Sequence, residues 1–144
     1  MIRRNIVILL AAAAVVATMS FVWGRIEADD PATQTVSGNV SENPIVAPAS
    51  FSDVAKMGER AFNASCAACH GANAGGTDVG PPLIHRIYEP SHHSDYAFEL
   101  AVANGVRAHH WRFGNMPPRP GLTRADVASI ITYVRELQRA NGIN

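Results

Sequence analysis

The sequence carries no excess of charge of either sign and no segment that reads as a β-strand. Lysine and arginine together number 12, aspartate and glutamate also number 12, and the arginines are scattered along the chain. Such a balance gives no electrostatic reason for binding nucleic acid, so we expect no nucleic-acid partner. Because no segment alternates apolar and polar residues convincingly, the expected fold class is all-α.

The sequence is also poor in cysteine, since Cys66 and Cys69 are the only two. They could form one disulfide, but a Cys-x-x-Cys spacing closes a very tight loop, which is unusual for a structural bridge. A zinc site needs four ligands, and here only histidines could supply the other two. A thioredoxin-like redox pair would need a βαβ context, which the sequence does not provide.

One long uncharged run is present at residues 6–23, directly after a short segment that contains Arg3 and Arg4. Eighteen helical residues span about 27 Å, close to the roughly 30 Å hydrocarbon core of a bilayer. The run is longer than the apolar part of a cleavable signal, although residues 22–24 could serve as a weak cleavage site. An uncleaved anchor and a cleaved signal both stay open, and both place the rest of the chain outside the cytoplasm.

Composition divides the chain into three parts. Residues 1–24 are the anchor or signal segment. Residues 25–49 are polar, contain three prolines and show no periodicity, which predicts a flexible linker. Residues 50–144 are the expected folded domain, which is small enough to benefit from a staple or a cofactor.

The first helix of this domain is expected over residues 50–65, with Ser50 and Asp53 resembling a capping box. Helical spacing assigns its buried face to five residues: Val54, Gly58, Ala61, Phe62 and Ser65. A glycine in the middle of a helix lowers stability, so we expect another part of the chain to approach Gly58 closely.

Two further helices are expected. One runs from about Asp95 to Asn104 and stops at Gly105. The other begins after Thr123, with Asp126 three positions on, and ends near Gly142. Its apolar stripe consists of Val127, Ile130, Ile131, Val134 and Leu137. The long glycine- and proline-rich loops between the helices are predicted to wrap around something functional.

His70 directly follows Cys69 and completes the sequence CAACH at residues 66–70. Cys-x-x-Cys-His is the attachment signature of c-type haem. In that chemistry each thiol adds to a vinyl group as a thioether, and the adjacent imidazole binds the iron. The motif therefore favours covalent haem over zinc.

Other motifs add to this one, and together they make residues 51–141 resemble the class I (mono-haem) cytochromes c of membrane-anchored or periplasmic bacterial type. The matching features are helix spacings and loop sequences: Gly58, Phe62 and Cys66 in the first helix; Ile130 and Tyr133 in the last; Gly80-Pro81-Pro82-Leu83 after the haem motif; and Met116 in GNMPP. The resemblance implies that the aromatic of the last helix packs at Gly58.

The resemblance also implies a fold and a site. The fold is the cytochrome c fold, with three to four helices and long loops wrapped around one haem, preceded here by a hydrophobic helix and a flexible linker. Cys66 and Cys69 would hold one haem c covalently. His70 would be the proximal iron ligand, Met116 the distal ligand, and the Pro81 carbonyl would accept the other ring N–H of His70.

With both axial positions filled, the expected function is transfer of one electron rather than catalysis. The resemblance implies a quinol-oxidising complex or a dehydrogenase as donor and a terminal oxidase as acceptor. The expected location is the inner membrane, with the haem domain in the periplasm, or the soluble periplasm after signal cleavage. Two alternatives stay open: a dedicated electron-accepting subunit of one periplasmic dehydrogenase or oxidase, and a copper-handling cytochrome.

Several other side chains have no assigned role. His92-His93 and His109-His110 are either surface and haem-rim residues or a second site for copper or zinc. His109 or His110 is also a rival to Met116 as iron ligand, and Met57 is a weaker one. The remaining candidates either contact haem carboxylates or fill the pocket wall and surface: His85, Tyr88, Trp111, Arg86, Arg107 and Arg112.

Overall fold

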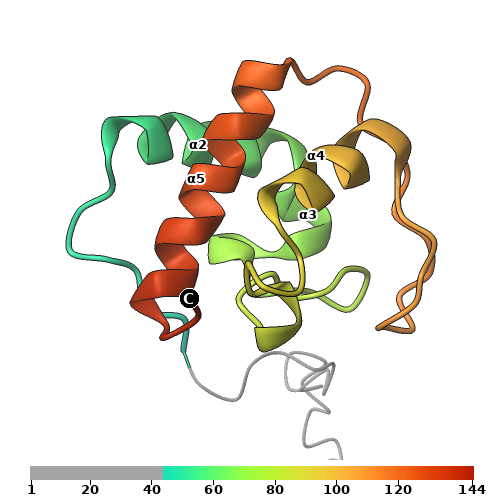
Figure 1. The fold of residues 1–144 in the computed structure, drawn as a ribbon, viewed down its shortest axis with the longest axis horizontal. Coiled ribbons are helices and arrows are strands. Elements are labelled where there is room, and N and C mark those ends of the chain that lie inside the picture. Colours follow the sequence, from blue (N-terminus) through green and yellow to red (C-terminus); the bar gives the residue numbers. More distant parts are fainter. Residues whose placement is uncertain (1–43) are drawn as a thin grey trace, which may run out of the picture. The chain divides into compact units, whose positions relative to one another are not determined.

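The computed structural model describes residues 44–144, which form a helical domain (Figure 1). Its elements, in chain order, are α2 (Asp53–Ser65), α3 (Ala67–His70), the 3-10 turns η2 (Ala72–Ala74) and η3 (Arg86–Tyr88), α4 (Asp95–Asn104) and α5 (Arg124–Ala140). Within these residues the only β-type pairing is an isolated bridge between Val106 and Met116. The all-α prediction is therefore confirmed for this part of the chain.

The predicted anchor or signal segment and most of the predicted linker fall at residues 1–43, outside the described residues. In the part that is described, no helix has the length and apolar character needed to cross a membrane.

The core is built around the crossing of α2 and α5, the two helices that share the most contacts (Figure 1). At the crossing, a methyl group added to Gly58 would overlap the backbone carbonyl of Ser129. The close approach predicted at Gly58 is confirmed, although its nearest neighbours are backbone atoms of Ser129 and Ile130 rather than the ring of Tyr133. Glycine therefore lets the two helix backbones touch.

Tyr133 fills the next layer of the core and is fully buried. Its ring lies 5.5 Å from the ring of Phe62 in α2 and 5.2 Å from the ring of Phe51, both in tilted arrangements. Such aromatic contacts bury large apolar areas in favourable geometry. Burial, helped by the negative charge of Glu59, raises the pKa of Tyr133 to about 12.

The predicted first helix needs two corrections. Its N-cap is Ser52, whose hydroxyl accepts a hydrogen bond from the backbone N–H of Ala55, so the helix does not begin at Ser50. Its buried residues are Ala55, Gly58 and Phe62, whereas Val54 is 51% exposed. Gly58 and Phe62 are buried as predicted, and Ala55 takes the place expected for Val54 on the face toward α5.

The other two helix predictions are confirmed. α4 occupies Asp95–Asn104 and is followed by Gly105, whose φ of 75° suits a residue without a side chain. α5 begins after Thr123 with a complete capping box formed with Asp126. The predicted stripe of α5 is buried throughout: Val127, Ile130, Ile131, Val134 and Leu137.

The last residues of the predicted linker lie against this domain. The backbone N–H of Val46 donates to Oδ1 of Asn141, at 3.0 Å, and the Nδ2 of Asn141 donates back to the Val46 carbonyl, at 2.8 Å. The side chain of Ile45 packs against the core beside Gly75. Val46 thus contacts the residue that follows α5, Ile45 packs on the core, and both belong structurally to the domain.

Arg135 of α5 ties the middle of the chain to the core. Its guanidinium is buried and donates to the carbonyl oxygens of Tyr88 and His93, to Gln138 and to the carboxylate of Asp95. One rigid fork therefore fixes the turn that follows η3 and the start of α4.

Candidate cofactor site

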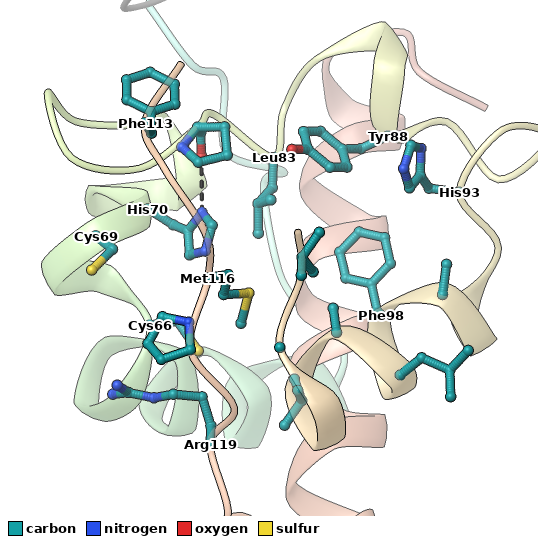
Figure 2. Close-up of a pocket in the computed structure, with 18 of the residues that line it drawn as sticks. Cys66, Cys69, His70, Leu83, Tyr88, His93, Phe98, Phe113, Met116 and Arg119 are labelled. Atoms are coloured by element: carbon teal, nitrogen blue, oxygen red, sulfur yellow. Dashed lines mark hydrogen bonds between the residues drawn. The ribbon is translucent and has the colours of Figure 1, made fainter. Parts of the chain in front are cut away.

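The CAACH segment continues α2 almost without a break. The N–H of Cys66 donates to the Phe62 carbonyl at 2.7 Å, and the N–H of His70 donates to the Cys66 carbonyl at 2.9 Å. Cys66 thereby caps α2 and precedes α3, which contains Cys69 and His70. This single extra turn of helix brings both thiols and the imidazole to one cavity (Figure 2).

Both cysteines are free thiols in the structure. Burial raises the pKa of Cys66, and the positive charge of Arg119 opposes that shift. The guanidinium of Arg119 donates to the Ser65 carbonyl at 2.6 Å, which holds this arginine at the edge of the cavity. Arg119 was not predicted as a site residue, because nothing in the local sequence connects it to Ser65, 54 positions earlier.

His70 is buried, and its Nδ1 lies 2.9 Å from the carbonyl oxygen of Pro81. Because a carbonyl can only accept, this contact places the ring proton on Nδ1 and leaves the lone pair of Nε2 free. Burial lowers the pKa of His70, against the smaller opposing effect of the hydrogen bond to Pro81. The imidazole is therefore kept neutral, in the form that binds metals.

The loop that supplies Pro81 is packed tightly on the CAACH segment. A methyl group at Gly80 would lie 2.5 Å from the carbonyl oxygen of Cys69, and the hydroxyl of Thr77 donates to that same oxygen. The position of the Pro81 carbonyl is consequently fixed by direct contact with the segment it orients.

Met116 enters the same cavity from the loop between α4 and α5 (Figure 2). Its backbone N–H and carbonyl both pair with Val106 at 2.9 Å. A methyl group at Gly105 would lie 2.5 Å from the Met116 carbonyl, so the bridge also depends on a glycine. Pro117 and Pro118 follow directly and limit the freedom of the loop. Met57, by contrast, is 56% exposed and does not line the cavity.

The cavity has a volume of about 460 Å³. This is within the range of roughly 300–1,000 Å³ that is usual for small-molecule and cofactor sites. Its walls are mostly apolar and come from the loops and from every helix except the 3-10 turn η2. The apolar side chains that line it include Phe62, Leu83, Phe98, Leu100, Val106 and Ile130. The α4 residues were not foreseen, because that helix shows no clear apolar stripe.

Trp111 also lines the cavity, and its indole N–H lacks a hydrogen-bond acceptor among the described residues. This nitrogen is buried and has no hydrogen-bond partner within residues 44–144. Burial raises the pKa of Tyr88, and the nearby indole of Trp111 partly opposes that rise. The indole N–H and the Tyr88 hydroxyl are nevertheless not aligned as a hydrogen bond. A buried N–H donor without an acceptor calls for a polar group on whatever fills the cavity.

The remaining histidines fall into two groups. His85 caps η3 through its Nδ1 and packs edge-on against Trp111, with the ring centroids 5.0 Å apart. The rings of His92, His93, His109 and His110 gather at one place near the cavity, as the sequence hypothesis of a joint cluster required. Desolvation, followed by the neighbouring imidazoles, lowers the pKa of His110. Arg86, Arg107 and Arg112 do not line the cavity.

Comparison with known proteins identifies the family. The family model described as Cytochrome c matches residues 55–138, which is more than half of the chain, so the chain belongs to the cytochrome c family. No curated protein and no solved structure matches it. Membership in the family implies covalently bound haem c and electron transfer through it.

The residues present fit such a group. The cavity offers two thiols at the spacing of the attachment motif, a neutral buried imidazole and largely apolar walls. The orphaned N–H of Trp111 matches the need of a haem carboxylate for a donor.

Proposed function

We propose that the chain is a mono-haem cytochrome c of class I that carries one electron. The observation that carries the proposal is that Cys66, Cys69, His70 and Met116 all line one apolar cavity (Figure 2). When bound, haem c supplies the one-electron couple between ferric and ferrous iron, and the protein supplies attachment, orientation and environment.

Each residue has a distinct role in this proposal. Cys66 and Cys69 hold the group by two thioethers, each formed when the S–H adds across a vinyl double bond. His70 binds iron through Nε2, since its Nδ1–H is engaged by the Pro81 carbonyl at 2.9 Å. Met116 would supply a second iron ligand, a thioether that would favour the ferrous state and raise the reduction potential.

Covalent attachment is tested by producing the full chain with haem-maturation machinery and measuring the mass of the denatured polypeptide. We expect the added mass of one haem, and we expect none in a variant with Cys66→Ala and Cys69→Ala. A wild-type polypeptide without this added mass would overturn the proposal and return the cysteines to the zinc hypothesis.

The Met116 ligand is tested separately. Met116→Ala should abolish the absorption band of sulfur bound to ferric iron and lower the reduction potential, because the soft thioether is lost. Met57→Ala is the matched control and should keep both, since Met57 is exposed and does not line the cavity. Persistence of the band in Met116→Ala would exclude Met116, and its absence from the wild type would favour His109 or His110.

If His70 and Met116 both bind the iron, no coordination position is left for a substrate. The proposal therefore implies electron carriage rather than catalysis. The ferric protein should then react poorly with cyanide and peroxide, whereas a haem enzyme keeps one position open. Fast reaction of the wild-type protein with either compound would contradict this part of the proposal.

The partners and the location are proposals as well. We propose a quinol-oxidising complex or a dehydrogenase as donor, a terminal oxidase as acceptor, and a periplasmic haem domain that is membrane-anchored through residues 1–24. Cell fractionation with N-terminal sequencing distinguishes this from a cleaved, soluble form. Stable co-purification with a single enzyme would instead indicate a dedicated subunit of that enzyme.

A further inference from the structure

Four histidines that the proposed haem site does not use come together from two separate loops. His92 and His93 lie in the turn before α4, and His109 and His110 lie in the loop before Met116. The ring centroid of His110 is 5.2 Å from those of both His92 and His93. Imidazole nitrogens gathered this closely form a set of donors of the kind that late transition metal ions bind.

We propose that His92, His93 and His110 bind one divalent late transition metal ion, Zn²⁺ or Cu²⁺, at the mouth of the cavity. One ring nitrogen from each residue lies within 4.8 Å of the others. Ligand nitrogens on a tetrahedral zinc ion are about 3.3 Å apart, because each lies about 2.0–2.1 Å from the metal. The ligands need to close by about 1.5 Å at most, a movement that the exposed side chains of His92 and His110 can make by rotation.

His93 is already held in the orientation that a metal ligand needs. Its Nδ1 lies 2.6 Å from the Ile87 carbonyl, which places the proton on Nδ1 and leaves the lone pair of Nε2 free. Metal-bound histidines almost always donate their second ring N–H in this way. The surrounding turn is fixed too, because the buried guanidinium of Arg135 donates to the His93 carbonyl.

The donor set determines the class of ion. Imidazole suits zinc, copper, nickel and iron, and the stability order among divalent ions peaks at copper. Three histidines leave one coordination position for water or for a group from outside, as in open zinc sites. His109 is adjacent, but none of its ring nitrogens belongs to the set that lies within 4.8 Å of one another.

The site borders the haem cavity, because His93 and His110 also line it. The metal site requires that His92, His93 and His110 do not bind the iron and stay accessible once the cavity is filled. The experiment therefore uses the full-length, haem-loaded chain, in detergent if it is membrane-bound.

Equilibrium dialysis against Zn²⁺, followed by elemental analysis, gives the ratio of zinc to iron. We expect one zinc per iron. His92→Gln, His93→Gln and His110→Gln should each weaken zinc binding by at least roughly tenfold, as loss of even an outer-shell partner does. His109→Gln is the matched control and should leave the affinity nearly unchanged. An unchanged haem absorption spectrum shows that each variant is folded.

A second probe is Cu²⁺, followed by electron paramagnetic resonance of the ferric protein. Splitting of the copper signal by imidazole nitrogens is expected in the wild type, and His110→Gln should reduce the number of coupled nitrogens. Failure of the haem-loaded protein to bind zinc, binding that His110→Gln leaves intact, or equal damage from His109→Gln would each overturn the three-histidine assignment. These outcomes leave the proposed haem ligands untouched, so the two proposals fail separately.

Discussion

Gly58 sets how closely α2 and α5 approach, because a methyl group there would overlap the Ser129 carbonyl. Alanine normally favours a helix over glycine by roughly 0.5–1 kcal/mol. Here the obstacle is backbone rather than the movable end of a side chain, so steric overlap outweighs propensity.

Gly58→Ala should therefore destabilise the haem-loaded protein by about 1–3 kcal/mol, the usual cost of overpacking a core. The measurement is denaturant unfolding. Gly121→Ala is the matched control, since a methyl group there meets nothing within 4 Å, and its effect should stay within about 0.5 kcal/mol. Equal stabilities for the two variants would show that the crossing can widen without loss.

At the level of the elements, α5 depends on its capping box. The Asp126 carboxylate accepts from the hydroxyl of Thr123 at 2.6 Å and from its backbone N–H at 2.9 Å. The hydroxyl and then the backbone N–H of Thr123 lower the pKa of Asp126. The stabilisation from this carboxylate is thus complete above its unfolded pKa of about 3.9 and is lost as the pH falls through the folded pKa.

Asp126→Asn should accordingly have a lower free energy of unfolding than the wild type at neutral pH. The difference between the two free energies should become smaller below about pH 4. The unfolded wild-type chain takes up a proton there before the folded one does, whereas asparagine does not titrate. Parallel urea titrations at several pH values measure this difference. If the difference in free energy of unfolding stayed constant across the acid range, the loss in Asp126→Asn would not come from the carboxylate charge.

The elements also show which features local sequence can predict. α4 and α5 were located correctly because their caps and stop signals are local. The start of α2 was placed two residues too early, because Ser50 with Asp53 resembles a capping box. In the structure it is the hydroxyl of Ser52 that accepts from the N–H of Ala55. The four-residue helix α3 and the turns η2 and η3 are too short to show any periodicity.

The residues of the site also differ in whether local sequence can predict them. Its cysteines, histidine and methionine stand in recognisable local motifs, so the sequence could nominate them. Arg135 could not be nominated, because its partner His93 is 42 residues away and an arginine in a helix ordinarily indicates a solvated face. Arg119 was not predicted for the same reason, since its partner Ser65 is 54 residues away.

At the scale of the whole molecule, Arg135 joins α5 to the turn before α4 and to α4 itself. The guanidinium is nearly buried, while the side chain of its partner Asp95 is 65% exposed. It donates to the carbonyl oxygens of Tyr88 and His93 at 2.7 Å and 2.5 Å, and the Tyr88 carbonyl also accepts from Nε2 of Gln138 at 3.0 Å. Lysine keeps the charge but cannot reach several acceptors in different directions at once.

Arg135→Lys should therefore lower the free energy of unfolding by roughly 2–4 kcal/mol, because buried acceptors lose charged donors. Denaturant unfolding measures this loss, and hydrogen exchange should show weaker protection in the turn around His93. Arg139→Lys, at an exposed position on the same helix, should change stability by no more than about 0.5 kcal/mol. An effect of similar size in both variants would contradict the role assigned to Arg135.

The hydrogen bond from Cys66 to Phe62 has a further consequence for the proposed electron carrier. It attaches the CAACH segment to the stretch of α2 that touches α5 backbone to backbone at Gly58. We therefore expect His70, the proposed iron ligand, to move little between oxidation states. A small movement of this kind would lower the reorganisation energy, and with it the barrier to electron exchange.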